Sequence, residues 1–175
     1  MKRIVTVMLI LGLSGTASPS TAAAAGPYCG QRWGSLQKVV TTGSTGDVVD
    51  VRAGRHACFD RLVLDVDGDL AGYFVGYVGA VHRDGSGDLV PLRGGARLEV
   101  TATAPTVPTD AFFLPDGQLV DVAGYRTFRQ VAWAGSFEGH TTVGLGVRAR
   151  LPFRVFILDG PGDFSRLVVD VGHRW

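Results

Sequence analysis

Short hydrophobic runs rich in valine recur from residue 47 to residue 171, and Gly, Asp or Arg interrupts each of them. Runs of β-branched and aromatic residues bounded by turn residues are typical of β-strands. About eight such strands cannot remain one flat sheet with both faces in water, so they predict two packed sheets or a closed barrel. The expected strands cover residues 47–52, 59–66, 73–81, 97–103, 129–133, 141–148, 153–158 and 167–171.

The composition also argues against helices. Surface helices normally use Lys, Glu and Met, but after Ala25 the chain has only one Lys, two Glu and no Met. Glycine, which disfavours helices, accounts for 25 of the 175 residues. A chain of this length supports one ordinary domain. We therefore expect a single all-β domain.

The N-terminus has the three-part layout of a secretory signal peptide. Lys2 and Arg3 precede an apolar run over residues 4–13, and small residues follow over residues 14–25. The run is shorter than the roughly 20 residues that a membrane span requires. We expect cleavage near Ala25, an N-terminal arm and polar connector over residues 26–46, and a folded domain over residues 47–175 of a soluble exported protein.

The charge balance disfavours nucleic acid as a partner. The full chain has 17 basic and 16 acidic residues, and removal of Lys2 and Arg3 leaves 15 basic against the same 16 acidic residues. A nucleic-acid binder normally carries an excess of positive charge.

Two cysteines, Cys29 and Cys58, remain in the exported chain. An even count in an oxidising compartment favours a disulfide, which would tie the arm to the start of the domain. Closing a loop of about 30 residues would stabilise the fold by roughly 3 to 4 kcal/mol. Two buried free thiols are the alternative.

One six-residue pattern occurs twice. Residues 61–66 (RLVLDV) and 166–171 (RLVVDV) share five of six positions. An antiparallel pairing with Val63 opposite Val168 would set Arg61 against Asp170 and Asp65 against Arg166. The alternative is that both segments are simply good strand sequences.

These segments resemble a known family. Residues 61–66, 73–78, 153–159 and 166–171, together with the Gly-rich segment 136–147, are similar to the AMIN domain. They are closer to the AMIN-like group of exported proteins and lipoproteins from high-GC Gram-positive bacteria. The resemblance covers roughly residues 48–171.

The resemblance implies a two-sheet β-sandwich outside the cytoplasmic membrane that binds peptidoglycan or another cell-wall polymer. The sequence contains no catalytic or phosphate-binding motif, so we expect neither catalysis nor a cofactor. The chain lacks the cysteine that carries a lipid in many AMIN-like relatives, so membrane tethering is not expected. Motif positions point to Arg61, Arg154 and Arg166 as ligand contacts, with Tyr73 beside them. Arginine can bind carboxylates, and aromatic faces pack on sugar rings.

Two other functions are open. An extracellular protein-interaction or inhibitor module could present the long, proline-containing segment 105–126 to an envelope protein. A small hydrolase would need dispersed catalytic residues, for which the sequence offers little. The histidines at 56, 82, 140 and 173 lack zinc-site spacing, and the Asp–Gly clusters at 65–69 and 84–88 suit turns better than calcium loops, so no metal site is expected.

Overall fold

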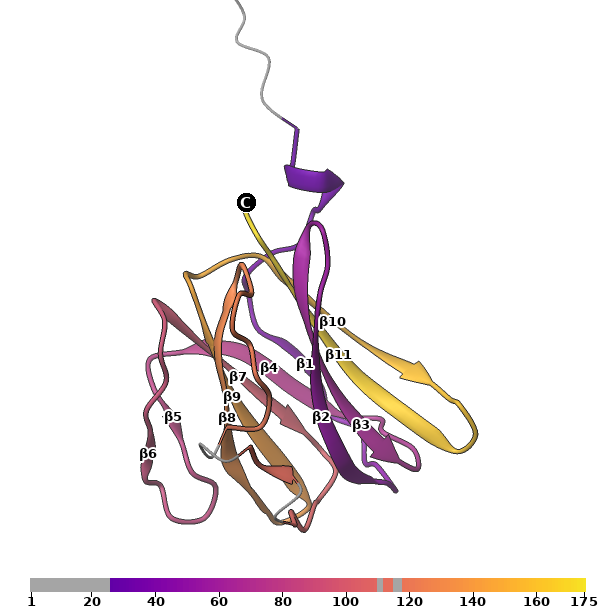
Figure 1. Ribbon diagram of the computed structural model, residues 1–175. Helices are drawn as coiled ribbons and strands as arrows, with labels where there is room; N and C mark the ends of the chain where they lie inside the picture. The colour runs from indigo at the N-terminus through magenta and orange to yellow at the C-terminus, as the bar shows by residue number, and fades with distance from the viewer. Residues whose placement is uncertain (1–25, 110–111, 115–117) are drawn as a thin grey trace, which may run out of the picture.

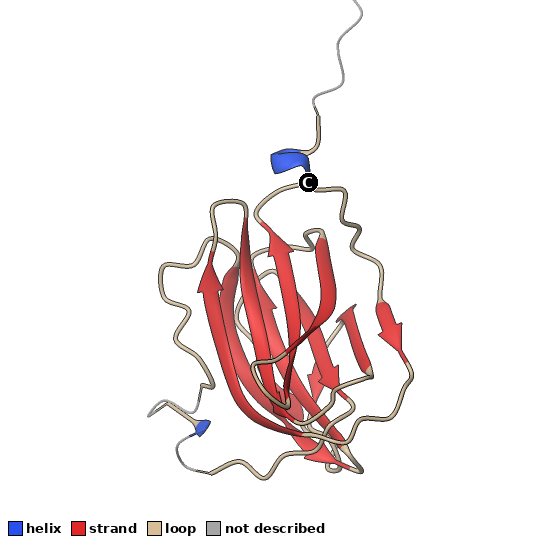
Figure 2. Ribbon diagram, turned by 90° about the vertical axis from the view of Figure 1, so that its right-hand side faces the viewer, coloured by secondary structure: helices blue, strands red, loops and turns tan. Residues whose placement is uncertain are grey.

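A computed structural model describes residues 26–109, 112–114 and 118–175 as an all-β sandwich. Two antiparallel sheets pack face to face (Figures 1 and 2), which confirms the predicted fold class. The predicted signal peptide, residues 1–25, lies outside the described residues. No helix in the described part of the chain has the length and apolar character that a membrane crossing needs.

All eight expected strands are present, with ends that shift by a few residues. The five-stranded sheet has the order β1-β4-β7-β9-β8, the four-stranded sheet has the order β10-β11-β3-β2, and β5 and β6 form a separate hairpin. The elements are η1 Tyr28–Gly30, β1 Lys38–Val40, β2 Asp47–Arg55, β3 Phe59–Asp67, β4 Tyr73–Val78, β5 Val81–His82, β6 Leu89–Val90, β7 Ala96–Ala102, β8 Phe128–Phe137, β9 His140–Val147, β10 Phe153–Asp159 and β11 Phe164–Gly172.

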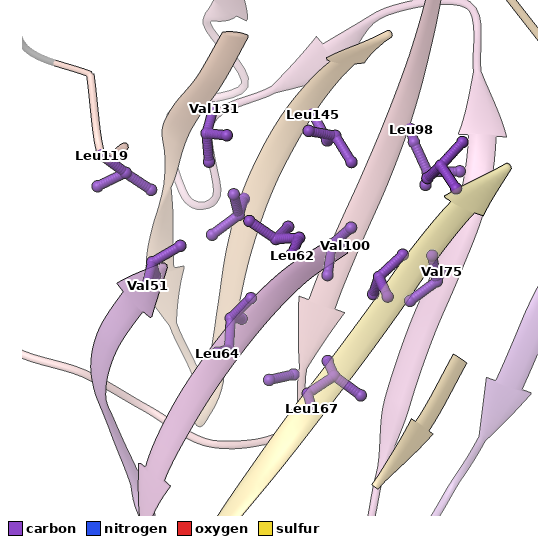
Figure 3. Packing of buried hydrophobic residues seen from close by; sticks show 14 of the residues in the cluster. Val51, Leu62, Leu64, Val75, Leu98, Val100, Leu119, Val131, Leu145 and Leu167 are labelled. Atoms are coloured by element: carbon purple, nitrogen blue, oxygen red, sulfur yellow. The ribbon is translucent and has the colours of Figure 1, made fainter. Parts of the chain in front are cut away.

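The core fills the space between the two main sheets. Leu62, Leu64 and Leu167 from the four-stranded sheet meet Leu98 and Leu145 from the five-stranded sheet (Figure 3), and all five are fully buried. Because successive side chains in a strand point to opposite faces, the residues between these leucines lie on the outer faces. The outer face of the four-stranded sheet therefore carries the charged residues of the repeated pattern, which are Arg61, Asp65, Arg166 and Asp170.

The repeated pattern pairs as the sequence predicts. β3 and β11 are antiparallel neighbours, with Val63 opposite Val168, Arg61 opposite Asp170, and Asp65 opposite Arg166. The two similar segments are thus the central strands of one sheet.

Three short strands were not expected from the sequence. β1 lies in the segment predicted as an arm and connector, and it pairs with β4. The expected strand over residues 73–81 ends at Val78, and Val81 begins the β5–β6 hairpin in place of a simple polar turn. Strands of two or three residues carry too little periodicity to be recognised, because their partners decide whether they form.

The β5–β6 hairpin belongs to a second, smaller apolar cluster. Val81 and Val90 pack with Leu92 and with Ala132 and Ala134 of β8.

The sequence predicts one solvent-exposed face for β7, but Arg97, Glu99 and Thr101 on that face are only partly exposed.

Glu99 should make stability fall as the pH rises. Burial raises the pKa of Glu99 above the ordinary value of 4.5, Asp84 raises it further, and His82 partly opposes this shift. Folding therefore favours the protonated carboxyl, and its contribution is fully present below pH 4.5 and is lost as the pH rises through the folded-state pKa.

We expect Glu99→Gln to raise the free energy of unfolding at pH 7 by less than about 1 kcal/mol, because the half-exposed carboxylate keeps part of its hydration. The gain should shrink towards pH 4 in urea-unfolding curves. The exposed Glu138 is the control, and Glu138→Gln should show no such trend. A gain that is equal at pH 4 and pH 7 would contradict the assignment.

Candidate functional site

Three charged residues form one row across the outer face of the four-stranded sheet. Arg154 of β10 is opposite Asp170 of β11, and Asp170 is opposite Arg61 of β3. All three belong to the strand positions that point away from the core, since their neighbours Phe153, Val169 and Leu62 are buried. The strand register alone therefore brings two arginines to one carboxylate.

The Asp170 carboxylate is fully buried beneath the two guanidinium groups. Arg61 donates from Nε to Oδ1 at 2.6 Å and from Nη2 to Oδ2 at 2.9 Å, and Arg154 donates from Nε to Oδ2 at 2.8 Å. The hydrogen bond to Asp170 raises the pKa of Arg61 above its usual range, although burial opposes the shift. With two arginines and one carboxylate, the row carries a formal net charge of +1.

Three aromatic rings surround the guanidinium groups. The Arg154 guanidinium carbon lies 4.6 Å from the centroid of the Trp33 ring and 5.0 Å from that of Phe156, and the Arg61 carbon lies 5.3 Å from the Phe59 centroid. Such contacts favour a cation over a ring face. We call this group the arginine–aromatic patch, and its members are Trp33, Phe59, Arg61, Arg154, Phe156 and Asp170.

The N-terminal arm supplies Trp33. A disulfide joins Cys29 to Cys58, the residue directly before Phe59, and so confirms the predicted pairing. The Trp33 and Phe59 rings then meet edge to face at 5.6 Å between centroids. The sequence predicts that the disulfide ties the arm to the domain, but not that Trp33 lies against Arg154.

Arg154 retains hydrogen-bonding capacity toward solvent. Its side chain is 42% exposed, and its bond to Asp170 uses only Nε. Among the described residues, no hydrogen bond from either Nη group occupies the donors that a bidentate contact with a carboxylate would use. Arg61 donates two hydrogen bonds to Asp170, from Nε and Nη2, whereas Arg154 donates one.

Arg166 lies on the same face but makes different contacts. The predicted register opposite Asp65 is confirmed, yet Asp65 accepts hydrogen bonds from Nε and Nη2 of Arg52 on β2. Arg166 donates from Nη2 to the carbonyl of Asp159 at 3.2 Å. The two residues thus occupy the predicted cross-strand positions, but Asp65 pairs with Arg52 because the strand on the other side of β3 provides a competing arginine.

The structure does not place Tyr73 beside the arginines. Tyr73 begins β4 in the five-stranded sheet and packs against the core cluster. It also lines a groove of about 570 Å³ with Val39 of β1 and with Phe74 and Thr101. The expectation that Tyr73 accompanies the three arginines is thus corrected, because it belongs to the other sheet of the sandwich.

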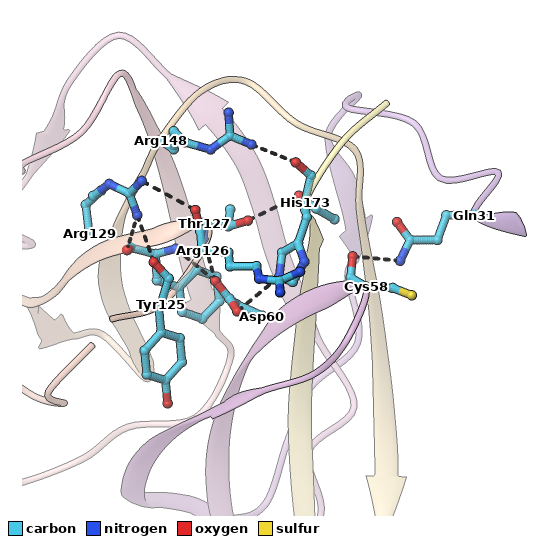
Figure 4. A network of polar contacts seen from close by, with 11 residues as sticks. Gln31, Cys58, Asp60, Tyr125, Arg126, Thr127, Arg129, Arg148 and His173 are labelled. Carbon is cyan, nitrogen blue, oxygen red and sulfur yellow. Dashed lines mark hydrogen bonds and ion pairs between the residues drawn. The ribbon is translucent and has the colours of Figure 1, made fainter. Parts of the chain in front are cut away.

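A second polar group is buried inside the fold. Asp60 Oδ2 accepts hydrogen bonds from the backbone N–H of Thr127 at 2.6 Å and of Phe128 at 3.2 Å, and Oδ1 lies 3.2 Å from His173 Nε2 (Figure 4). The His173 carbonyl accepts a hydrogen bond from Arg148. These contacts join the ends of strands. Because Asp60 and His173 are almost fully buried, they offer little access to a ligand.

Segment 105–126 contributes to the core. Leu119 and Val122 are buried, and the Phe112 ring contacts Trp133 of β8 edge to face. The end of the segment lines a cavity of about 420 Å³ that includes Tyr125. The apolar side chains that could attract a protein partner are therefore partly used within the fold.

The patch combines positive charge with aromatic rings on one face of the sheet. Its positive charge and flat rings suit an anionic group that is attached to an apolar or sugar ring. In the part of the chain that the structure describes, no three His, Cys, Asp or Glu side chains gather as metal ligands.

Sequence reasoning missed the aromatic members of the patch. Phe59 lies two residues from Arg61, and Phe156 lies two residues from Arg154, so strand alternation could have placed each ring on the same face as its arginine. Trp33 gives no such signal, because it is not part of a strand.

A comparison with protein-family models matches residues 46–173 to the AMIN-like domain. Neither a search of curated proteins nor a search of solved structures gives a match.

Proposed function

Because this chain belongs to the AMIN-like domain family, a family associated with the cell envelope, we propose that it is a non-catalytic module that binds peptidoglycan through the arginine–aromatic patch. Family membership supports the location, and the patch supports the kind of ligand.

The observation that carries this proposal is the Arg61–Asp170–Arg154 row with its three rings. Asp170 fixes both guanidinium groups on a rigid sheet, and the Nη groups of the partly exposed Arg154 side chain provide donors for a carboxylate. The aromatic rings provide surfaces for sugar rings. Peptidoglycan contains both groups, since its glycan strands carry peptide stems that end in carboxylates.

The disulfide supports a location outside the cytoplasm. Disulfides persist in oxidising compartments and are rare in the reducing cytosol. The predicted signal peptide agrees with export of the protein to the compartment in which peptidoglycan lies.

Co-sedimentation tests the proposed function. The exported chain, residues 26–175, is mixed with purified peptidoglycan and with the same material after removal of its peptide stems, at low and moderate salt. Strong binding only to intact material would indicate that the stems are part of the ligand, and retained binding would indicate that the glycan is sufficient. Failure to bind either material would overturn the proposal and favour a protein partner.

Arg154→Gln should weaken binding to intact peptidoglycan by about tenfold or more, because it removes a charge-assisted hydrogen bond to the ligand. Arg97→Gln on β7 removes the same charge from the other sheet and is the matched control. Equal affinities of the two variants, measured in the same sedimentation assay, would argue against the patch as the binding surface.

A further inference from the structure

We propose that Trp33 is a specificity-determining residue of the patch, so that the ligand is a carboxylate-bearing saccharide and not a peptide alone. In this arrangement Trp33 contacts a sugar ring of the peptidoglycan repeat, and Arg154 binds a carboxylate of the stem on the same repeat. The inference rests on the proposed function and names the ligand class of the same site.

The arm is fastened on both sides of Trp33. On one side are the Cys29–Cys58 disulfide and a hydrogen bond from Gln31 Nε2 to the Cys58 carbonyl at 3.1 Å. On the other side, the Gly34 carbonyl accepts a hydrogen bond from the backbone N–H of Phe153 at 3.0 Å. Arg150 also binds the backbone carbonyl and hydroxyl of Ser35. These contacts hold the Trp33 backbone against the start of β10.

Core packing does not explain why Trp33 is held there. Among the described residues, neither apolar cluster includes Trp33, Phe59 or Phe156. Trp33 is partly exposed, and its ring contacts lie on the outer face of the sheet. An aromatic side chain that is fixed in position and remains partly open to solvent is suited to contact a ligand with little loss of conformational entropy.

The geometry requires the two ligand groups to be close together. The Arg154 guanidinium carbon lies 4.6 Å from the Trp33 ring centroid, so a ligand that reaches both must carry its ring and its acid on neighbouring parts of one molecule. A sugar with an attached acidic peptide meets this requirement. A neutral glycan lacks the acid, and a free stem peptide lacks the sugar ring.

Trp33 is also an element that family membership does not supply. The family model begins at residue 46, so the arm that carries Trp33 precedes the matched region. Any preference that Trp33 gives would therefore distinguish this chain from a protein that has the matched domain alone.

The test measures binding of three soluble probes released from peptidoglycan: the disaccharide–peptide repeat, the disaccharide without peptide, and the free stem peptide. We expect wild type to bind the disaccharide–peptide most tightly. Trp33→Ala should weaken that binding about tenfold and leave binding of the free peptide unchanged. Arg154→Gln should weaken binding of both peptide-containing probes.

Leu36→Ala is the matched control, since Leu36 lies on the same arm and is 76% exposed. It should bind all three probes as wild type does. A variant with Trp133→Phe and Trp175→Phe leaves Trp33 as the only tryptophan of the exported chain. Its fluorescence should change on addition of the disaccharide–peptide and stay constant with the free peptide.

The possible failures are distinguishable. If Trp33→Ala binds the disaccharide–peptide within twofold of wild type while Arg154→Gln still weakens binding, the role of Trp33 is overturned and the proposed function stands. If wild type binds none of the probes and does not co-sediment with peptidoglycan, the proposed function itself is overturned.

Discussion

Replacing Asp170 with asparagine is expected to lower the free energy of unfolding by about 3 kcal/mol and to weaken peptidoglycan binding, although both arginines remain. The Asp170 side chain is fully buried and accepts hydrogen bonds from Arg61 and Arg154. Removing one member of a buried ion pair commonly costs about 3 to 5 kcal/mol, because the remaining charge is left uncompensated. The lower figure applies because the two arginines are partly exposed and can regain water.

Asp65→Asn is the matched control for the stability measurement. Asp65 occupies the same face of β3 and pairs with Arg52, which is 52% exposed. Exposed ion pairs contribute at most about 1 kcal/mol, so this substitution should have a small effect on urea-unfolding curves at pH 7. Equal losses for the two variants would show that Asp170 is not a special anchor of the patch.

The binding measurement separates charge from orientation. Asp170→Asn increases the positive charge of the patch, so a ligand attracted by charge alone should bind more tightly. If Asp170 instead holds the guanidinium groups in a productive orientation, affinity for intact peptidoglycan should fall. An affinity above that of wild type would contradict the orienting role.

Removing the disulfide by Cys29→Ser together with Cys58→Ser should lower the free energy of unfolding by about 3 to 4 kcal/mol. The two cysteines are 29 residues apart, and a crosslink over that distance restricts the unfolded chain by this amount in the chain-entropy model. For a domain of this size the thermal midpoint should fall by about 10 °C. Reduction of the wild type should give the same midpoint as the double variant.

The same double variant should bind the disaccharide–peptide as weakly as Trp33→Ala, because release of the arm removes Trp33 from Arg154. Trp33→Ala keeps the crosslink and should therefore change the thermal midpoint only slightly. A double variant that loses stability but binds as wild type does would show that the remaining arm contacts suffice to hold Trp33. A loss of stability below about 1 kcal/mol would contradict the chain-entropy account.

Local sequence information predicted the long strands and suggested one register that the structure confirms. Alternation in residues 61–66 and 166–171 separates core leucines and valines from the charged positions, and the shared pattern places Val63 opposite Val168. A shift of one residue would turn every buried side chain of a strand to the solvent, so this register is strongly specified. The even count of cysteines favours the crosslink, and the structure confirms it.

The sequence could not show which of two neighbouring strands supplies the partner of a charged side chain. Asp65 faces Arg166 as predicted but pairs with Arg52, because β2 lies along the other edge of β3. Tyr73 and Arg154 are both strand residues near family motifs, yet the topology assigns their strands to different sheets. Such choices depend on which strands become neighbours, and hydrophobic periodicity does not encode this.

The sequence by itself determined the all-β class and the eight long strands, because both depend on alternation and turn residues. It favoured the disulfide over two free thiols and left the Val63–Val168 register as one of two alternatives, and the structure decided both. Only the tertiary structure decided that Arg154 shares Asp170 with Arg61 and that Trp33 covers Arg154. Those contacts join β3, β10, β11 and the arm, and Trp33 and Arg154 are 121 residues apart in the sequence. Contacts over such separations are fixed by the packing of the whole domain and not by local sequence.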